Sequence, residues 1–512
     1  MENNYENLKL INKYKIPVQQ LIVENNITLE SSDGVSKVLS INSKVDLDGP
    51  SEIFKGECST TGKIINNIVY VTENGEINNQ NTITPFIAKI SNENLDLTSK
   101  IDLSVNVVNT ELAKENGNQL KVLSTLELCG VVVKNLEQNY LKEVKENIFA
   151  KQIEQEVVSL KSQNCESFEE SVEVKLKDGV KKVLLTNVDV LIKDWTCGTN
   201  YISVEGEIYV KILYANNYEI SELQTVTIAK PFKQEIEADG LSKEFDIDVF
   251  SSIINEKVQV EIEEKENNDT IINVLVPVLI CFDVYECKKI MSMIDVYSTE
   301  SVLSLKSDEV QNHKSCKPEF LDGKIEGNIT LSDNEPRVDK YLAVTNVCCN
   351  VSNCYVNNGV LNAEGIVNAN VIYLNDELGT IQSVQIEIPY ITSKKVELEN
   401  DVILQPSVCV DDVDVMVKRG REIYFDAKVK LFINVSCKSE VCVISSVEEV
   451  EKLPKKDSAI EIYFAKAGDS VWDIAKNLKI PADVIVNQNP HICDPLEKDE
   501  NITIYFQKSR KC

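Results

Sequence analysis

The stretch GEIYVKILY, residues 206–214, decides the fold class because two other parts of the chain repeat its pattern. GKIINNIVY (62–70) and GIVNANVIY (365–373) share with it a glycine, an Ile or Val two and six residues later, and a tyrosine eight residues later. Side chains an even number of residues apart point to the same face of a β-strand. The pattern therefore predicts a half-buried strand in three copies of one repeat.

The sequence around each copy repeats as well. An apolar segment led by a lysine begins 24 or 25 residues before each glycine, and a proline followed by an aromatic residue stands 23 to 25 residues after it. These residues are Lys37, Lys182 and Lys340, and Pro85-Phe86, Pro231-Phe232 and Pro389-Tyr390. We therefore expect three antiparallel β domains of sandwich-like or barrel-like form, each of roughly 100 to 120 residues. Because this period exceeds that of solenoid repeats, we expect separately folded domains, not one stacked array.

We divide the chain into seven segments on this basis. They are β repeat 1 with an N-terminal segment (1–133), a helical spacer (134–175), β repeat 2 (176–300), a linker (301–336), β repeat 3 (337–440), a tether (441–460) and a small final domain (461–508). The helical spacer is predicted because Leu141, Val144 and Ile148 begin an apolar stripe at roughly helical spacing. The tether is predicted from a charge-rich segment that contains Pro454.

Charge and composition exclude several classes of protein. The formal net charge of −29, with 82 acidic against 53 basic residues, argues against nucleic acid as a partner, because phosphate binding needs clustered Lys and Arg. The most apolar run, residues 271–285, is too short to span a bilayer and contains Pro277, so no membrane span is expected. The start of the chain lacks the pattern of a signal peptide, and we expect an intracellular protein.

Neither a metal site nor an active site is expected. The fifteen cysteines are scattered without a C-x-x-C pair, and the chain has two histidines, His313 and His491. Zinc sites need closely paired ligands, so we interpret the cysteines as small buried hydrophobic residues in a reducing compartment. The sequence has no G-x-S-x-G, Walker A or H-E-x-x-H motif. We therefore predict a protein without catalytic residues, metal or cofactor.

The segment KAGDSVWDIAKNLKI (466–480) predicts a short capped helix near the end of the chain. Ser470 suits the N-cap position, and Asp473 three residues later completes a capping-box-like pair. Val471, Ile474 and Leu478 recur at helical spacing, which predicts one apolar face. This segment therefore belongs to a small domain of a different kind from the β repeats.

Both parts of the chain resemble known families. The repeat, with its Gly–Tyr strand and Pro-aromatic pair, resembles the SPOCS domain of spore-coat-associated proteins from endospore formers. The resemblance covers copies two and three well, whereas copy one carries Asn66 on the face expected to be buried. The final domain is similar to LysM domains, because Gly468 to Ala475 matches their G-D-S-x-W-x-I-A pattern and VIVNQNP follows. This second resemblance implies a βααβ fold for residues 461–508, and we expect Trp472 in its core because so small a domain needs its largest residue partly buried.

The LysM resemblance also implies where a ligand binds. LysM domains that bind N-acetylglucosamine polymers hold them between the loop that opens the first helix and the loop after the second helix. In this chain the corresponding residues are Lys466, Gly468, Asp469, Ser470, Asn489, Pro490, His491 and Ile492. The usual Pro-Gly turn before the last strand is replaced by Lys498–Glu500, so a protein partner and a glycan both remain candidate ligands.

SPOCS repeats followed by one C-terminal LysM domain are the arrangement of clostridial spore coat morphogenetic proteins. The resemblance implies a non-catalytic adaptor in the mother-cell cytoplasm, at the surface of the forespore and in the spore coat. Its LysM domain would bind a scaffold ATPase of the coat (SpoIVA-like), so that coat is localised and encases the forespore, with other coat proteins as further candidate partners. The alternative is a protein of the cell wall or spore cortex whose LysM domain binds peptidoglycan.

Overall fold

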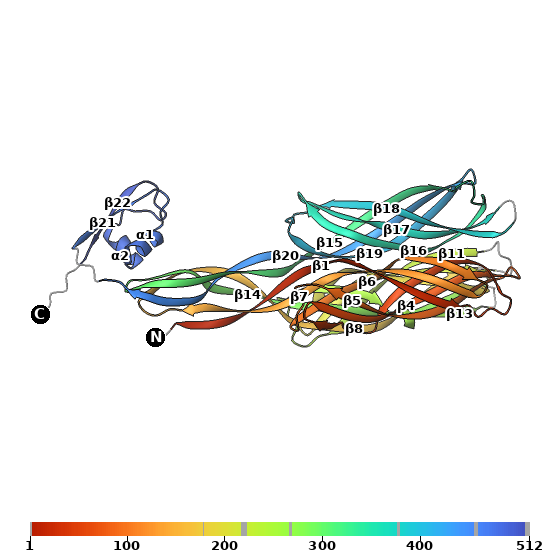
Figure 1. Cartoon of the computed structure of the whole chain (residues 1–512), viewed down its shortest axis with the longest axis horizontal. Coiled ribbons are helices and arrows are strands. Elements are labelled where there is room, and N and C mark those ends of the chain that lie inside the picture. Colours follow the sequence, from red (N-terminus) through yellow and green to blue (C-terminus); the bar gives the residue numbers. More distant parts are fainter. Residues whose placement is uncertain are drawn as a thin grey trace.

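The computed structural model describes residues 3–177, 179–216, 223–265, 269–375, 379–454 and 459–506. It consists mainly of antiparallel β-structure with two short helices near the C-terminus, as the sequence predicts. The strands form an elongated body with a broad head at one end and a narrow, twisted shaft at the other (Figure 1). The small helical domain lies at the tip of the shaft (Figure 1).

Three β repeats make up the head and the shaft. Repeat 1 contains β1 (Asn4–Thr28), β2 (Val35–Leu47), β3 (Glu52–Phe54), β4 (Glu57–Thr72), β5 (Ile77–Ser91), β6 (Ser99–Asn116) and β7 (Gln119–Glu143). Repeat 2 contains β8 (Ile148–Leu176), β9 (Lys182–Cys197), β10 (Tyr201–Ala215), β11 (Leu223–Glu237), β12 (Asp246–Ile253), β13 (Gln259–Glu264) and β14 (Thr270–Ser298), with the 3-10 helix η2 (Asn255–Lys257) before β13. Repeat 3 contains β15 (Ser301–Thr330), β16 (Val338–Asn357), β17 (Val360–Asn375), β18 (Ile381–Lys395), β19 (Val402–Lys418) and β20 (Glu422–Lys452).

Each repeat folds as two sheets that enclose an apolar core. In repeat 3 the sheets have the strand orders β16-β17-β18 and β15-β20-β19. Repeat 2 has the matching sheets β9-β10-β11 and β8-β14-β12, with β13 also paired to β14. Repeat 1 follows the same plan, with β4 between β2 and β5 and with β7 between β1 and β6. In every repeat the first strand therefore pairs with the last strand, which closes the unit.

The strand that contains GEIYVKILY is β10, and its counterparts β4 and β17 are also central strands. The predicted buried face is confirmed, because Ile208, Ile212 and Tyr214 lie in the core of repeat 2. The other face of β10 is buried as well: Leu213 packs into a cluster that all three repeats share. The members of this shared cluster at corresponding positions are Leu39, Leu184 and Leu342, and Val69, Leu213 and Ile372. The repeats are therefore packed against one another and do not stand apart as isolated domains, because this second apolar face is buried where they meet.

The repeated glycine and the repeated aromatic residue are neighbours across two strands. Gly206 on β10 lies opposite Phe232 on β11. A Cβ atom at position 206 would lie 2.6 Å from the carbonyl oxygen of Leu191 and 2.6 Å from the Phe232 ring. Glycine is needed here because the ring covers the backbone where a side chain would otherwise stand. Gly62 with Phe86 and Gly365 with Tyr390 form the same pairs in the other repeats.

Three of the expected connecting segments are strands. The helical spacer predicted at 134–175 is wrong, because these residues form the end of β7 and most of β8. The linker predicted at 301–336 is largely β15, and the tether predicted at 441–460 contains the end of β20. The physical reason is long-range pairing: β8 pairs with β14 along nearly its whole length, and such pairing overrides an approximate helical spacing.

The shaft is built from the ends of six long strands, paired as β1–β7, β8–β14 and β15–β20. Its core takes apolar side chains from all three repeats, among them Leu10, Val157 and Val441. The side-chain amide of Gln155 bonds to the backbone of Cys442 as a neighbouring strand would. Its Nε2 donates to the Cys442 carbonyl oxygen at 2.8 Å, and its Oε1 accepts from the Cys442 backbone nitrogen at 3.0 Å. The shaft is therefore a joint product of the three repeats.

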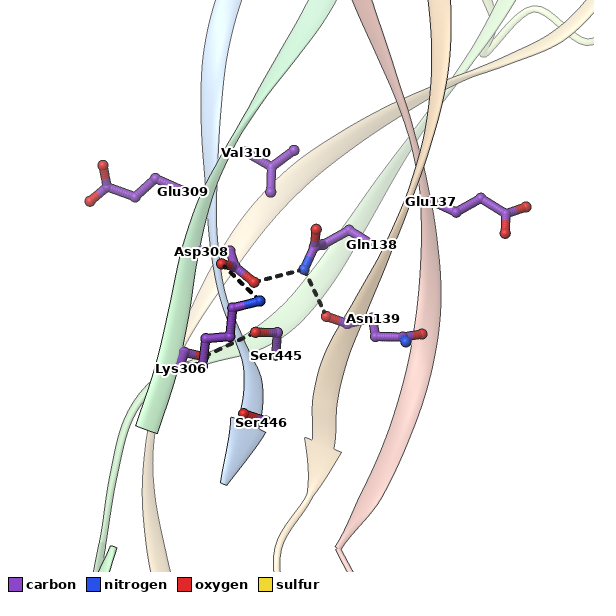
Figure 2. A pocket seen from close by; sticks show the side chains of 9 residues that line it. All are labelled: Glu137, Gln138, Asn139, Lys306, Asp308, Glu309, Val310, Ser445 and Ser446. Atoms are coloured by element: carbon purple, nitrogen blue, oxygen red, sulfur yellow. Dashed lines mark hydrogen bonds and ion pairs between the residues drawn. The ribbon is translucent and has the colours of Figure 1, made fainter. Parts of the chain in front are cut away.

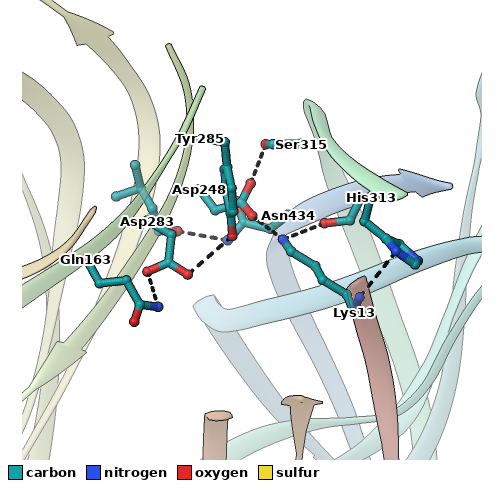
Figure 3. A network of polar contacts seen from close by, with 10 residues as sticks. Lys13, Gln163, Asp248, Asp283, Tyr285, His313, Ser315 and Asn434 are labelled. Carbon is teal, nitrogen blue, oxygen red and sulfur yellow. Dashed lines mark hydrogen bonds and ion pairs between the residues drawn. The ribbon is translucent and has the colours of Figure 1, made fainter. Parts of the chain in front are cut away.

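A buried polar network joins the three repeats (Figure 3). Lys13 of repeat 1 is 2% exposed, and its Nζ lies 2.7 Å from an oxygen of Asp248 in repeat 2. The same nitrogen donates to Ser436 Oγ in repeat 3 at 2.8 Å. His313 Nδ1 accepts from the Lys13 backbone nitrogen at 3.2 Å, and Ser315 donates to Asp248. Because a buried ion pair needs such additional hydrogen bonds, the network fixes how the three repeats sit against one another.

Asn66, the polar residue in the predicted core of repeat 1, is 1% exposed. Its Oδ1 accepts from Ser43 Oγ at 2.6 Å, and its Nδ2 donates to Thr84 Oγ1 at 3.4 Å. A buried amide is tolerated when it is hydrogen-bonded. The departure of copy one from the apolar pattern is therefore compensated by Ser43 and Thr84.

Four of the cysteines form two disulfides, Cys165–Cys281 and Cys316–Cys437. These bonds differ from the expectation of free thiols. Their partners are 116 and 121 residues apart in the sequence and meet only because the first and last strands of a repeat pair. The free cysteines of the described residues are mostly buried or partly buried, which agrees with their interpretation as small hydrophobic residues.

Candidate functional site

The final domain has the predicted βααβ order. It contains β21 (Ile460–Ala465), α1 (Val471–Leu478), α2 (Ala482–Gln488) and β22 (Glu500–Tyr505), and the two strands pair antiparallel. Ile474, Ile485 and Ile502 lie in its core. Residues 507 and 508 of the expected domain lie outside the described residues.

The predicted cap of α1 is confirmed. Ser470 Oγ accepts from the Asp473 backbone nitrogen at 3.1 Å and donates to an Asp473 carboxylate oxygen at 2.5 Å. The negative charge of Asp473 also lies in the first turn, where it is favourable to the helix dipole. Ser470 is therefore used to begin the helix.

The first predicted binding loop, residues 466–470, is held by the chain between α2 and β22. The Gly468 nitrogen donates to the Leu496 carbonyl oxygen at 2.8 Å, and the Leu496 nitrogen donates to the Asp469 carbonyl oxygen at 3.0 Å. Gly468 has a φ of +93°, a conformation that favours glycine. A carboxylate oxygen of Asp469 accepts from the Lys466 nitrogen at 2.9 Å. The side chain of Asp469 thus stabilises its own loop.

The second predicted loop contains a structural residue and an exposed edge. Asn489 is 3% exposed, and its side chain exchanges hydrogen bonds of 3.0 Å with the backbone of Thr503 in both directions. Ile492 packs against the domain core. Pro490 and His491 are exposed, and His491 Nε2 lies 3.6 Å from a Glu500 carboxylate oxygen. Of the eight predicted site residues, Lys466, Pro490 and His491 present exposed side chains, whereas those of Asp469, Ser470 and Asn489 bond within the domain.

The helical side of the domain rests on the shaft tip. Trp472 Nε1 donates to Asp295 on β14 at 2.8 Å, and Lys476 Nζ lies 2.7 and 2.8 Å from the two oxygens of the same carboxylate. Tyr297, also on β14, is 1% exposed and donates to the carbonyl oxygen of Ile480 at 2.8 Å. Its ring meets that of Trp472 edge to face at 5.0 Å. We call this contact the dock.

The dock changes the interpretation of two sequence features. Trp472, expected in the core, is partly buried, and it packs on Tyr297 as well as on the domain itself. The predicted tether does not leave the final domain free, because the domain is docked on the shaft. Sequence reasoning missed Asp295 and Tyr297, and no local signal marks them, since they lie more than 170 residues before their partners.

The outer face of β21 is apolar. Ile460, Ile462 and Phe464 alternate along β21 and are 53%, 54% and 75% exposed. Tyr505 on β22 pairs with Ile460 and is 58% exposed. These four residues define the apolar sheet face. Large apolar side chains gathered on one exposed surface are typical of protein interaction sites.

A concave surface lies on the shaft (Figure 2). This groove of about 640 Å³ is lined by side chains of β7, β15 and β20, all of them polar except Val310. Gln138 Nε2 donates to Asp308 across it at 3.0 Å. The described residues contain no group of three or more His, Cys, Asp or Glu side chains that could hold a metal ion. The lining residues of the groove include neither a histidine nor a cysteine.

No helix in the described part of the chain is long and apolar enough to cross a membrane.

Comparison with known families agrees with this geometry. Residues 463–495 match the family model of the LysM domain, and residues 179–269 match that of the SipL, SPOCS domain. The chain carries a SPOCS domain and a LysM domain. The SPOCS match covers β9 to β13 of repeat 2, and the LysM match covers both helices. Both families are non-catalytic, and the SPOCS match indicates a role in sporulation. No curated protein sequence matches the chain.

Proposed function

We propose that the protein is a non-catalytic adaptor of spore coat assembly, whose LysM domain binds a scaffold ATPase of the coat (SpoIVA-like) on the mother-cell side of the forespore. The combination of a SPOCS domain with a C-terminal LysM domain supports the setting. Through this contact the protein localises coat material, which then encases the forespore. Other coat proteins are the proposed partners of the β repeats.

The apolar sheet face is the observation that carries the choice of a protein ligand. The dock contacts Trp472 and the carbonyl group of Ile480, whereas Phe464 and its neighbours remain exposed. Exposed aromatic and aliphatic side chains at the centre of a contact contribute most of the binding energy in protein interfaces. The LysM domain therefore offers its sheet to a protein partner.

The predicted glycan groove has few side chains that are free to hydrogen-bond to a sugar. Sugar recognition depends on hydrogen-bonding groups that are free to meet hydroxyl and amide groups of the ligand. The side chains of Asp469, Ser470 and Asn489 already bond within the domain. The alternative function, binding of peptidoglycan or N-acetylglucosamine polymers, would therefore rest on Lys466, Pro490 and His491.

The shape of the molecule suits an adaptor. The LysM domain lies at one end of the shaft, and most strands of the three repeats gather at the other end (Figure 1). A partner held at the LysM domain would therefore be separated from coat proteins held at the head. The formal net charge of −29 keeps the exposed surface soluble and favours basic surfaces on those partners.

The experiment is co-purification of the full chain with the coat scaffold ATPase, beside retention on purified peptidoglycan sacculi. Phe464→Asp should reduce recovery of the ATPase at least tenfold, because it places a charge in the apolar sheet face, while His491→Ala should leave recovery unchanged. Circular dichroism checks that both variants fold. Retention on sacculi that His491→Ala abolishes, with ATPase recovery unaffected by Phe464→Asp, would favour the glycan function and contradict the proposal.

A further inference from the structure

The two cysteine pairs occupy corresponding places in repeats 2 and 3. Cys165 on β8 is the register partner of Cys281 on β14. Cys316 on β15 lies diagonally across from Cys437 on β20. In both repeats the pair joins the first strand to the last. The two cysteines are 116 or 121 positions apart in the sequence, and all the remaining strands of that repeat lie between them. Each bond therefore closes a loop around one whole repeat.

Repeat 1 has the same architecture but lacks the pair. Its last strand carries the free Cys129, and its first strand, β1, contains no cysteine. Cys129 lies where the register between β1 and β7 shifts, opposite the residues between Ile16 and Gln19. The chain therefore contains an unlinked copy of the unit, against which the linked copies can be compared.

Both pairs are accessible from solvent. Cys165 is exposed on β8. Cys316 is partly exposed and lines a pocket of about 360 Å³ together with Trp195 and Lys317. By contrast, burial raises the pKa of the free Cys129 and Cys348 thiols, which keeps them protonated and poorly reactive.

We propose that the pairs are two redox-dependent clasps, thiols in a reducing compartment and disulfides after exposure to an oxidising one. The oxidant is a low-molecular-weight disulfide. A protein thiolate attacks this disulfide, which gives a mixed disulfide and releases one small thiolate. The partner cysteine then attacks the protein sulfur and releases the second small thiolate. Two protein thiols become one disulfide, one small disulfide becomes two thiols, and the two protons lost by the protein are taken up by the released thiolates.

Formation of the two disulfides would stabilise repeats 2 and 3 against unfolding by restricting the unfolded chain. A cross-link that spans more than a hundred residues removes many conformations from the unfolded state and few from the folded one. Ser315 and Ser436, which directly precede Cys316 and Cys437 in the sequence, belong to the buried polar network. The second clasp therefore also holds the contacts that join the three repeats.

The test compares the full chain after equilibration with oxidised or reduced glutathione. Mass spectrometry of non-reduced peptides should detect Cys165–Cys281 and Cys316–Cys437 after oxidation and neither after reduction. The guanidinium midpoint of unfolding should rise by about 0.5 M or more on oxidation.

Three variants separate the clasps from other thiols. Cys165→Ser and Cys316→Ser should each abolish one linked peptide and lose part of the rise in midpoint, while Cys129→Ser should retain the full rise. The proposal is overturned if neither linked peptide forms, if the midpoint is the same in both forms, or if Cys129→Ser alone removes the difference.

Discussion

Asp295 receives hydrogen bonds from two side chains of the LysM domain, Trp472 and Lys476. Hydrogen bonds to a charged acceptor are stronger than those between neutral groups, and each contributes about 1–3 kcal/mol. Asp295→Ala should therefore loosen the dock. In a Trp195→Phe background the emission of Trp472 should shift to longer wavelength as its ring gains contact with water. Glu154→Ala removes an exposed carboxylate of the shaft and is the matched control; an identical emission in both variants would count against the dock.

Asp102 on β6, which lies close enough to Lys13 and Asp248 of the buried network to feel their charges, should make stability depend on pH. Burial, together with the nearby carboxylate of Asp283, raises the pKa of Asp102 to about 8. One Asp102 oxygen is buried without a hydrogen-bond partner among the described residues. The folded state thus holds this proton more tightly than the unfolded state does. Its contribution to stability is present at low pH and is lost as the pH rises toward about 8.

His313 acts in the opposite direction at lower pH. Burial lowers its pKa from 6.5 to about 4, so that its contribution to stability is lost as the pH falls through this range. Between pH 6.5 and about 8, Asp102 therefore contributes more than His313 to the change of stability with pH. Denaturant unfolding across this window should show stability falling for the natural chain and a flatter profile for Asp102→Asn. Equal slopes for the two proteins would contradict the assignment.

At the residue scale the sequence predicts the cap of α1 well and the ligand site incompletely. Ser470 and Asp473 are three residues apart, so their bond follows from local geometry. The role of Asn489 depends on Thr503, which the fold brings beside it. Asp295 and Tyr297 lie even farther from their partners in the sequence, and contacts of this range have no local pattern.

Among the elements, the central strands are the ones that the sequence predicts best. β4, β10 and β17 each carry apolar residues at even spacing and a glycine opposite an aromatic residue. The first strand of each repeat has no local signal, because its partner is the last strand, which follows only after all the other strands of that repeat. In β8 the alternation is weak, since much of its surface is exposed, and an approximate helical spacing was the stronger local pattern.

The pairing of glycine with an aromatic ring makes a prediction for β10. Gly206→Ala should destabilise the protein by about 1–3 kcal/mol, because the new Cβ meets the Phe232 ring and the backbone of β9. Denaturant unfolding measures the loss. Gly179→Ala is the control, since a Cβ atom there meets nothing within 4 Å. If the two variants are equally stable, the ring is not what requires glycine at position 206.

For the whole molecule, the common core of the repeats is the feature that links fold to function. The sequence contains its signal, because Val69, Leu213 and Ile372 are apolar on the face of the strand that a half-buried repeat would leave to solvent. Burial of this second face combines the three repeats into one body, and their long strands continue as the shaft. The shaft then holds the LysM domain through the dock, with Phe464 exposed and Trp472 packed on Tyr297.

We propose that the docked LysM domain binds a protein through its apolar sheet face. Hydrogen–deuterium exchange of the full chain, alone and bound to the coat scaffold ATPase, tests it most directly. We predict slower exchange of the backbone amides of β21 and β22 in the complex, with the loops 466–470 and 489–492 unchanged. Protection confined to those two loops, or no protection anywhere in the LysM domain, would contradict the account.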